Sequence, residues 1–422
     1  MSDLHKISAE KALERELRCS FCDKEPNEGS DLIVGPGVSI CGECIAASSD
    51  ILSAEDRDGG EESFEPGEDD PEGGQPGQDD PSANHRSQNV SVTRPKRFRL
   101  LTDADVNGLV SLDELIDLMP DVLRRFSSGG AVQPVRTVMP VGRDRERFSV
   151  MPACFRDSSA LGAKLETVFE QNSARDLPTR LATILLFDPE TGALWAVIDG
   201  SFITEIRTAA VSAVSADLLA RESASELAIV GCGVQARSHL DAMESLFELS
   251  QVRVWSRTPE HQAAFLEVMG TSTQAKLVGT DSAEQAVRGA DLVVLATSAS
   301  EPVIRNDWIK EGAHVISIGA GRPDEREMDP ALVARGRLFV ESREVALVES
   351  GDIALGIKEH RFNASHVAGE LGELVANKVE GRRSPREITI FKSLGLAVED
   401  IAAADLVYRR AMARDIGQEL EI

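Results

Sequence analysis

Basic residues are scarce in this chain. Of its 422 residues, 45 are Lys or Arg and 71 are Asp or Glu, which gives a formal net charge of −26 at pH 7. Because an acidic surface repels phosphate backbones, this balance argues against nucleic acid as a main partner. The length is too great for one small domain and suits two or three.

Cysteines and long apolar runs are scarce as well. Six cysteines are too few for a disulfide scaffold in a chain of this length. The N-terminal MSDLHKISAEKALERELR is polar and does not resemble a signal peptide. No uninterrupted apolar run approaches the ~20 residues that span a bilayer. These absences predict a cytoplasmic protein with no membrane partner.

One segment lacks almost every residue that could build a core. Residues 55–80 hold twelve Asp or Glu against one Arg, with repeated Gly and Pro and one aromatic residue, Phe64. We interpret 54–93 as an acidic disordered linker, and a dedicated binding role for the acidic tract is the alternative. The linker separates a small head, 1–53, from a large body, 94–422.

The head carries four cysteines in two CxxC pairs. Cys19 and Cys22 form the first pair, Cys41 and Cys44 form the second, and eighteen residues lie between the pairs. Each pair places two thiolates on one side of a metal, and two pairs complete a closed tetrahedral site that suits one structural Zn²⁺. Zinc binding explains how so short a segment folds, because metal affinity becomes folding free energy.

The head also resembles a known module. CSFC and LIVGPGVSICGECI, within about 15–52, are similar to the N-terminal zinc-binding domain of the ClpX unfoldase family. The resemblance implies a small, treble-clef-like C4 zinc finger of the kind that dimerises and binds adaptor proteins and unfolded substrates. The chain contains no Walker motif GxxxxGK[ST], so the head resembles the recognition module without its motor.

The body alternates apolar runs with segments of helical pattern. Ser111 to Glu114 has the sequence of a capping box, and apolar residues then recur at helical spacing on one face: Leu112, Leu115, Ile116 and Met119. Later runs rich in Val, Ile and Leu are separated mostly by helix-like segments: 226–230, 252–255, 291–296, 314–318 and 337–340. This alternation predicts an α/β fold with parallel strands and crossover helices.

A glycine-rich turn in ELAIVGCGVQARSHL joins one of these runs to a helix-like segment. The spacing Gly231-x-Gly233-x-x-Ala236 is that of a dinucleotide-binding fingerprint, in which the pyrophosphate lies at the helix N-terminus. The first Gly permits the turn, the second lets the pyrophosphate approach, and the small third residue lets helix and strand pack closely. Cys232 is then a variable turn residue and His239 a helix surface residue. The alternative is an incidental glycine turn.

The end of the next apolar run bears on the choice of cofactor. An NAD enzyme places Asp or Glu about twenty residues after the fingerprint, against the ribose 2′-OH. Here VRVWSRTPE ends in Ser256, Arg257 and Thr258, with no carboxylate at the strand tip. A guanidinium and two hydroxyls suit a 2′-phosphate, which favours NADP(H) over NAD(H). In the alternative, Arg257 is a solvated loop residue and both cofactors bind.

Three cations stand in apolar or small-residue surroundings. They are Arg136 in VQPVRTVMPV, Lys164 in LGAKLETVF and Arg207 in EIRTAAVSA. A buried cation is costly unless it is paired. Three cations that converge on one pocket suit a substrate carboxylate, and separate structural salt bridges are the alternative.

The segments around the three cations and the glycine-rich turn resemble the ornithine cyclodeaminase/μ-crystallin family over about 98–415. Further segments that carry the resemblance are LFDPETG, GAGRPDEREMD, ESGDI and ITIFKSLGLAVED. The resemblance implies an NAD(P)-dependent enzyme that interconverts amino and imino acids by hydride transfer. It also implies a Rossmann domain, 217–385, inserted in an α+β substrate and dimerisation domain, 94–216, to which a C-terminal helix, 386–422, returns. Because head and body both resemble dimer-forming modules, a homodimer is expected.

The resemblance also suggests roles for individual residues. Arg136, Lys164 and Arg207 match the substrate-carboxylate and catalytic positions of the family, with Lys164 as hydrogen-bond donor or proton relay at the imino group. Further residues match stretches that line the cofactor: Thr179, Thr208, Gln235 and Thr297.

Two positions depart from the cyclodeaminase branch of that family. Met151 stands near the place of a carboxylate that meets the distal ammonium of ornithine. Gly321, in GAGRPDEREMDP, stands where that branch and the alanine dehydrogenases have a catalytic Asp. μ-Crystallin-like members also lack this Asp and share the RPDxRE pattern. The departures argue against deamination of ornithine.

The predicted function is therefore NADPH-dependent reduction of a cyclic or linear α-imino acid, or the reverse dehydrogenation. A ketimine that arrives protonated needs less from an active-site acid, which is compatible with Gly321. One alternative is a non-catalytic NADP(H)-binding regulator or adaptor whose zinc head recruits partner or unfolded proteins. A second alternative is a true ornithine cyclodeaminase or alanine dehydrogenase.

Overall fold

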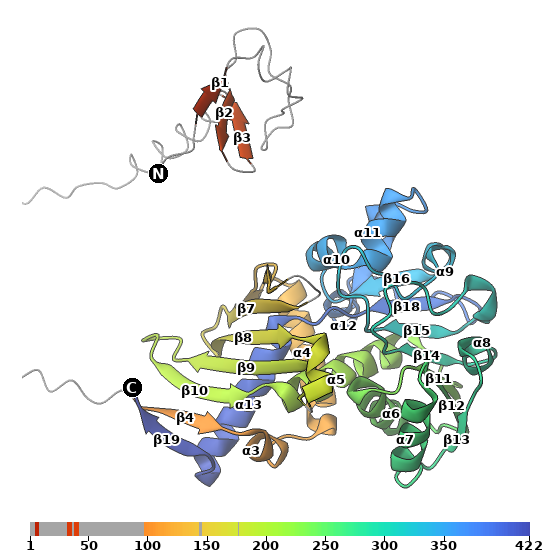
Figure 1. Cartoon of the computed structure of the whole chain (residues 1–422), viewed down its shortest axis with the longest axis horizontal. Coiled ribbons are helices and arrows are strands. Elements are labelled where there is room, and N and C mark those ends of the chain that lie inside the picture. The colour runs from red at the N-terminus through yellow and green to blue at the C-terminus, as the bar shows by residue number, and fades with distance from the viewer. Residues whose placement is uncertain (1–4, 8–31, 36–37, 42–96, 143–145, 176) are drawn as a thin grey trace, which may run out of the picture. The chain divides into compact units, whose positions relative to one another are not determined.

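The chain divides into two compact units, 1–89 and 90–422. The structure, a computed structural model (Figure 1), describes the following residues: 5–7, 32–35, 38–41, 97–142, 146–175 and 177–422. Within the first unit, three antiparallel strands lie in chain order: β1 (His5–Ile7), β2 (Leu32–Gly35) and β3 (Val38–Cys41).

Most of the predicted zinc site and the whole predicted linker lie outside the described residues. Cys41 ends β3, but Cys19, Cys22 and Cys44 belong to the part of the chain that is not described. The same holds for the acidic linker, 54–93.

The second unit begins with a largely antiparallel sheet. Its strand order is β19-β4-β10-β9-β8-β7-β5, β6 also pairs with β7, and the β4–β10 pair is parallel. The strands have these bounds: β4 (Arg97–Leu101), β5 (Ala131–Val132), β6 (Thr137–Pro140), β7 (Arg147–Phe155), β8 (Leu161–Val168), β9 (Arg180–Phe187), β10 (Leu194–Asp199) and β19 (Gln418–Glu421). Every second residue of β8 is buried, so one face of this sheet is covered.

Four helices accompany this sheet: α3 (Asp103–Asn107), α4 (Leu112–Ser127), α5 (Ser201–Leu219) and α13 (Ala397–Arg414); a short 3₁₀ turn, η1 (Glu170–Arg175), follows β8. The predicted capping box of α4 is confirmed, because Ser111 Oγ accepts from the Glu114 amide at 3.4 Å and Glu114 accepts from the Ser111 amide at 2.9 Å. In the described part of the chain, no helix has the length and apolar character that crossing a membrane requires.

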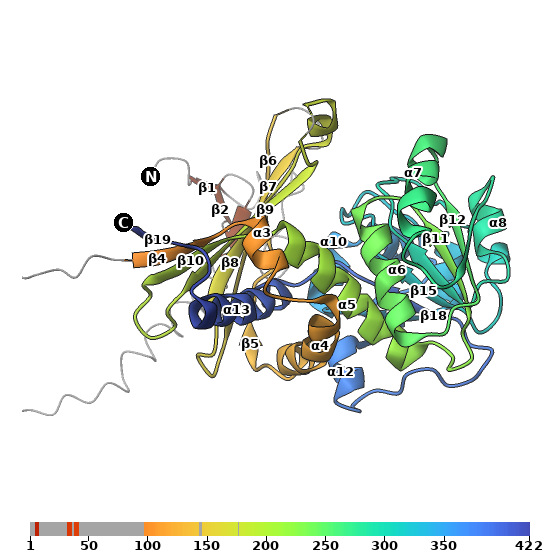
Figure 2. The ribbon, with the colours of Figure 1, turned by 90° about the horizontal axis from the view of Figure 1, so that it is seen from below.

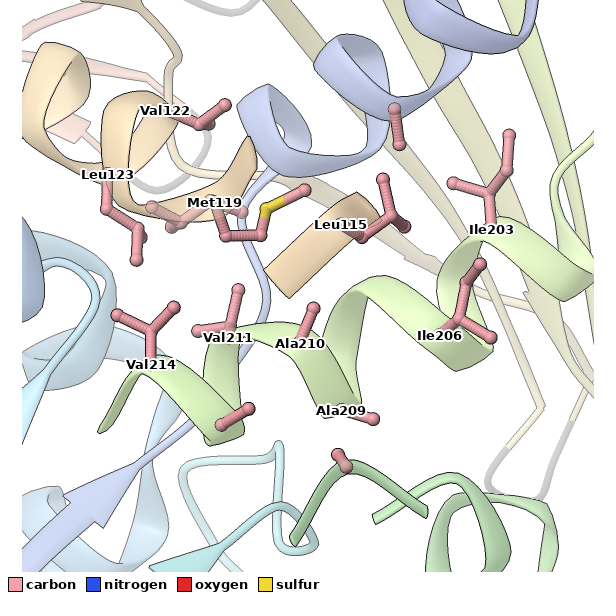
Figure 3. Close-up of a cluster of buried hydrophobic side chains, with 14 of the residues drawn as sticks. Leu115, Met119, Val122, Leu123, Ile203, Ile206, Ala209, Ala210, Val211 and Val214 are labelled. Atoms are coloured by element: carbon pink, nitrogen blue, oxygen red, sulfur yellow. The ribbon is translucent and has the colours of Figure 1, made fainter. Parts of the chain in front are cut away.

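The core of this half lies between α4 and α5 (Figure 3). On α4, Leu115 and Met119 are fully buried, as the helical spacing predicts. On α5, Ala210 and Val211 point toward α4, and the small side chain of Ala210 lets the two helices pack closely (Figure 3). Each fully buried Leu or Met contributes about 1.5–3 kcal/mol relative to an exposed side chain.

A second sheet of parallel strands follows, in the order β13-β12-β11-β14-β15-β18-β16-β17. Its strands have these bounds: β11 (Glu226–Val230), β12 (Gln251–Trp255), β13 (Lys276–Gly279), β14 (Leu292–Leu295), β15 (His314–Ser317), β16 (Arg337–Val340), β17 (Val367–Glu370) and β18 (Thr389–Lys392). All the apolar runs predicted as strands are strands of this sheet, and their pairing is parallel. The predicted α/β fold class is confirmed.

Helices cover both faces of the parallel sheet (Figure 2). Leu227 and Ile229 of β11 face the core on the side of α5 and α6, whereas Ala228 and Val230 face the core on the side of α8 and α9. The helices and 3₁₀ turns have these bounds: α6 (Val234–Leu246), α7 (Pro259–Met269), α8 (Ala283–Val287), η2 (Asn306–Trp308), α9 (Pro330–Arg335), α10 (Arg343–Glu349), α11 (Gly351–Lys358), η3 (Ala364–His366) and α12 (Leu371–Val375).

The C-terminal segment contributes to both sheets. Strand β18 lies between β15 and β16 of the parallel sheet, and all four of its residues are buried. Only after Lys392 does the chain return to the first sheet, through α13 and β19. The part of the predicted segment 386–422 that returns is therefore shorter than expected, and the division of the body into domains stays a prediction.

Two buried histidines join α5 to the second sheet and its helices. His239 of α6 donates through Nδ1 to the Gln235 carbonyl at 2.6 Å, and its Nε2 lies 2.9 Å from Ser212 Oγ. His314 of β15 lies between Ser215 Oγ at 3.2 Å and Thr389 Oγ1 at 2.9 Å. The prediction that His239 is a surface residue is wrong, because α5 covers this face of α6.

The buried histidines make the free energy of unfolding depend on pH. Burial lowers the pKa of His239 from 6.5 to about 4, and burial with the nearby Arg382 charge lowers the pKa of His314 to about 3. A lowered histidine pKa contributes stability that is complete above the unfolded pKa and is lost as pH falls toward the folded pKa. Since tenfold in proton affinity is about 1.4 kcal/mol, the contribution is on the order of 3 kcal/mol for His239 and 5 kcal/mol for His314.

We predict that His239→Gln flattens the loss of stability between pH 6.5 and 4.5. Urea unfolding at several pH values measures this slope, and at pH 7.5 the variant should be less stable by about 1–3 kcal/mol because buried hydrogen bonds are lost. His261→Gln, on the exposed side of α7, is the matched control and should keep the slope of the unmodified protein. Equal slopes for both variants would contradict the prediction.

Candidate active site

The glycine turn after β11 has the conformation that its spacing predicts. Gly231 has φ of +112°, and a Cβ there would lie 2.2 Å from the Ala296 carbonyl oxygen, so no other residue fits without movement. Gly233 is the N-cap of α6, and a Cβ on it would meet no atom within 4 Å. The free N-terminus of α6 thus faces open space beside a closed turn, which fits a pyrophosphate.

The other residues of the fingerprint are divided between the core and this turn. Ala236 is fully buried where α6 packs on the sheet. Gln235 is partly exposed, and its Oε1 atom is buried without a hydrogen-bond partner among the described residues. Cys232 is buried, and burial raises the pKa of its thiol to about 11, so the turn holds an unreactive thiol.

The tip of β12 carries a free guanidinium and no carboxylate. Arg257 is exposed and forms no ion pair with any described residue. Ser256 and Thr258 flank it: the Ser256 amide donates to Gln262 at 3.3 Å, and the Thr258 amide donates to Ser256 Oγ at 3.3 Å. Thr258 is also the N-cap of α7. These three residues therefore form a short loop with one unpaired positive charge.

The three threonines predicted to line the cofactor lie in different places. Thr297 follows β14, next to the fingerprint, since a Cβ on Gly231 would lie 3.5 Å from its methyl group. Thr208 lies within α5 and donates its hydroxyl to the Thr204 carbonyl at 2.7 Å. Thr179 is exposed just before β9. No hydrogen bond in the described part of the chain joins Thr179 or Thr208 to the fingerprint.

Lys164 and Arg207 form one buried ion-pair network with carboxylates from α13. Lys164 of β8 lies 2.6 Å from Asp400, whose other oxygen accepts from Arg207 Nε at 2.9 Å. Arg207 Nη1 donates to Glu399 at 2.8 Å. Lys164 and Arg207 are 1% and 4% exposed. Both cations are thus held in structural ion pairs that share Asp400, and their roles toward a substrate stay a prediction.

Burial shifts the ionisation of this network. It lowers the pKa of Lys164, although Asp400 opposes the shift. Burial opposes the charge of Arg207 too, but Asp400 and Glu399 together raise its pKa. For Glu399, burial and the neighbouring Glu341 raise the pKa to about 8. Burial thus favours the protonated form of Glu399, while both cations stay in ion pairs.

Arg136 reaches the same region from the loop before β6. Its Nε lies 2.9 Å from Glu349 at the end of α10, and Nη2 donates to the Leu394 and Gly395 carbonyls at 2.8 and 2.7 Å. Nη1 lies 3.8 Å from Met151 Sδ. Because sulfur is a weak acceptor, Nη1 is the least committed donor of this guanidinium.

Met151 connects Arg136 with Lys164. It is 2% exposed and stands opposite Lys164 in the β7–β8 register. A thioether at this point cannot pair with a substrate ammonium. Gly395, with φ of +74°, closes the group: its carbonyl accepts from Arg136, and a Cβ on it would lie 2.5 Å from Arg207 Nη1. The structure thus brings the three predicted cations together.

The carboxylates of this site do not appear among the residues that sequence patterns single out. They are Glu341, Glu349, Glu399 and Asp400. Two of them stand in LAVED, directly after the glycine turn at 395, and this adjacent pair of acids in an apolar segment is the signal that could have found them. Glu341 accepts from Ser393 Oγ at 2.7 Å and from the Leu394 amide at 2.8 Å, which shapes that turn.

Gly321 occupies an exposed position with room for a side chain. A Cβ on it would meet no atom within 4 Å, and it follows Ala320, whose φ is +50°. Two residues earlier the same loop is tight, because a Cβ on Gly319 would lie 2.3 Å from the Thr297 carbonyl oxygen. The loop therefore contacts the segment after β14 at Gly319 and turns away from it by Gly321, a position that carries no acidic side chain.

Two family models match the chain. Residues 97–415 match the ornithine cyclodeaminase/mu-crystallin family, and residues 17–54 match the ClpX C4-type zinc finger. Both resemblances inferred from the sequence are confirmed.

Among curated proteins, ketimine reductase mu-crystallin of Rattus norvegicus is 41% identical over 312 residues, 73% of this chain and 96% of that protein. A delta(1)-pyrroline-2-carboxylate reductase of Bacillus cereus is 34% identical over 314 residues, 74% and 96% of the two chains.

Solved structures give the same picture. The delta(1)-pyrroline-2-carboxylate reductase of Thermococcus litoralis, in complex with NADH and L-proline, is 37% identical with a TM-score of 0.74; the match covers 76% of this chain and 99% of that one. An archaeal alanine dehydrogenase dimer with bound NAD is 29% identical with a TM-score of 0.73, over 77% and 99%. A nicotinamide dinucleotide is bound in both structures.

We predict that Gly233→Ala and Gly231→Ala separate cofactor binding from folding. Gly233→Ala adds a methyl group in open space, so stability should stay within about 1 kcal/mol of the unmodified protein, while NADPH binding weakens by roughly tenfold or more because the pyrophosphate needs that space. Gly231→Ala, at positive φ and against the Ala296 carbonyl, should lower stability by about 1–3 kcal/mol as well.

Urea unfolding and titration of NADPH fluorescence measure the two effects. Unchanged NADPH affinity in Gly233→Ala would show that the N-terminus of α6 does not hold the pyrophosphate.

Proposed function

Since the chain belongs to the ornithine cyclodeaminase/mu-crystallin family, we propose that it is an NAD(P)H-dependent oxidoreductase that reduces a small α-imino acid to the amino acid. The observation that carries this proposal is the placement of Arg136 and Lys164 on either side of Met151, with Arg207 joined to Lys164 through Asp400. The relatives named as ketimine and pyrroline-2-carboxylate reductases support this reaction class.

Arg136 binds the substrate carboxylate in this proposal, and Lys164 acts at the imino group. Arg136 offers Nη1, whose neighbour is the Met151 sulfur, while Glu349 and two carbonyls hold the rest of the guanidinium in place. Arg207 is committed to Asp400 and Glu399, so it acts by fixing Asp400, which in turn orients Lys164. Such preorganisation costs no rearrangement when the substrate arrives.

Reduction of an imine requires a hydride at carbon and a proton at nitrogen. The reduced nicotinamide supplies the hydride when it is bound. In this proposal Lys164 hydrogen-bonds the imino nitrogen or its water, and burial lowers its pKa, which makes its proton easier to transfer. Because Gly321 brings no acid, the substrate is best taken as an already protonated ketimine. The same absence, with Met151, argues against ornithine deamination and alanine dehydrogenation.

We also propose NADP(H) as the preferred cofactor. The unpaired Arg257 and the neighbouring hydroxyls of Ser256 and Thr258 form a loop that suits a 2′-phosphate, and no carboxylate at the strand tip competes for it.

The head supports a separate role. We propose that Cys19, Cys22, Cys41 and Cys44 hold one structural Zn²⁺ and that this zinc finger mediates dimerisation or recruits a partner protein. We also propose a cytoplasmic location, because zinc thiolates persist in reducing surroundings. The acting form is then a homodimer, in keeping with the alanine dehydrogenase dimer that the body resembles.

We predict that Lys164→Met lowers kcat/KM for piperideine-2-carboxylate and pyrroline-2-carboxylate by roughly 100-fold or more, since it removes a proton donor. Affinity for NADPH should not change, because Lys164 contacts the carboxylate network and not the fingerprint. Lys276→Met, exposed on β13, is the control with full activity. If the unmodified protein binds NADPH but reduces neither compound, nor a keto acid with an amine, the non-catalytic adaptor becomes the better hypothesis.

A second prediction concerns Arg257. Arg257→Ala should weaken NADPH binding about tenfold, the loss of one charge-assisted interaction, and leave NADH binding unchanged. Arg288→Ala removes another exposed arginine, at the C-terminal end of α8, and should affect neither. Parallel titration of both nucleotides gives the ratio, and an NADH affinity tenfold higher than that for NADPH in the unmodified protein would overturn the cofactor preference.

A further inference from the structure

Glu327 is a fully buried carboxylate that accepts four hydrogen bonds. One oxygen accepts from the Thr297 amide at 2.8 Å and from the Thr297 hydroxyl at 2.6 Å. The other accepts from Ser317 Oγ at 3.0 Å and from the Gly319 amide at 2.8 Å. Its exposed fraction is 0%. Each oxygen accepts from one backbone amide, which can only donate, so both oxygens of Glu327 serve as hydrogen-bond acceptors.

These donors stand at the carboxyl ends of two neighbouring strands. Thr297 follows β14, Ser317 ends β15, and the two strands pair side by side (Figure 1). Strand β14 also pairs with β11, where the strand order of the parallel sheet reverses direction. In doubly wound sheets a dinucleotide binds outside the carboxyl ends of the strands at this reversal. Glu327 therefore clamps together two loops that border the dinucleotide region.

The loops that contain Thr297 and Gly319 are in direct contact. A Cβ on Gly319 would lie 2.3 Å from the Thr297 carbonyl oxygen and 2.5 Å from Glu327 Oε1. The two loops thus touch directly, and a small change at Glu327 would be transmitted to both.

The charge around Glu327 is not balanced. Lys392 of β18 lies 3.3 Å from Asp352 of α11, and its ammonium also donates to Ser317 and to the Gly319 carbonyl. Asp352 accepts from the Glu327 and Met328 amides at 3.0 and 2.9 Å. Two buried carboxylates therefore share one ammonium. Burial raises the pKa of Glu327 to about 7, and the Lys392 charge opposes the shift.

A glutamine of the same shape would remove one buried negative charge here, although its amide nitrogen would face a backbone amide. Glutamine at position 327 would leave Lys392 and Asp352 as a balanced pair and remove the cost of a second buried negative charge. A carboxylate that costs stability, and whose bonds all go to cofactor-side loops, points to a role in function.

We infer that Glu327 is a positioning residue, which holds Thr297 and Gly319 in the arrangement that receives the nicotinamide half of the dinucleotide. The inference rests on the proposed function, and it assigns Glu327 no contact with the reacting atoms. It acts through the two loops.

Glu327→Gln in the full chain tests this role. NADPH titration should show roughly tenfold weaker binding, because the amide nitrogen faces donors and one side of the clamp opens. Without NADPH, the melting temperature should stay equal or rise. In the unmodified protein, NADPH affinity should increase from pH 6 to pH 8 as Glu327 ionises, whereas the variant should show a flat profile. Glu359→Gln, which removes an exposed carboxylate paired with Arg326, should behave as the unmodified protein does.

Each outcome decides the matter. If Glu327→Gln has the NADPH affinity and the pH profile of the unmodified protein, the inference is wrong. It is also wrong if the affinity falls only together with the melting temperature and if both recover in the double variant Glu327→Gln/Lys392→Gln. Failure of the unmodified protein to bind NADPH would overturn both this inference and the proposed function. If the unmodified protein binds NADPH but reduces no imino acid, the proposed function is wrong. The NADPH affinity of Glu327→Gln then still tests the role of Glu327.

Discussion

Two buried cations beside the first sheet are stable only when carboxylates pair with them, and this constraint fixes the position of the C-terminal helix. Lys164 and Arg207 are almost completely buried, and Asp400 lies between them. Removal of one partner from a buried ion pair typically costs about 3–5 kcal/mol. The first turn of α13, which supplies Asp400 and Glu399, is therefore fixed where β8 and α5 meet. From there α13 delivers β19 to the sheet edge beside β4.

The turn between β18 and α13 connects the two halves of the body. Carbonyls of Leu394 and Gly395 accept from Arg136, while Glu341, at the end of β16, accepts from both of their amides. Gly395 has no side chain, and this lets Arg207 lie against it. One short segment thus positions two of the three cations relative to the parallel sheet, so the site depends on residues from both halves.

Local patterns in the sequence predict much of the fold and half of the site. The parallel strands, the capping box of α4 and the turn from Gly231 to Gly233 depend on neighbours in the chain, and each has the predicted form. The carboxylates that pair with Arg136 and Arg207 lie 213 and 193 residues away, and nothing local marks them as partners. The prediction for His239 failed because α5 buries it through Ser212, 27 residues earlier, and no pattern around His239 indicates that contact.

The position of Asp400 has a consequence for synthesis of the protein. Chains emerge from the ribosome N-terminus first, and domains usually fold as they emerge. Here β8 and α5 are made long before α13, so Lys164 and Arg207 have no counter-charge until almost the whole chain exists. The parallel sheet, whose last strand is β18, is complete before the first sheet can close. Final burial of the two cations therefore has to wait until α13 has been made, and a chain that stops before residue 397 cannot reach it.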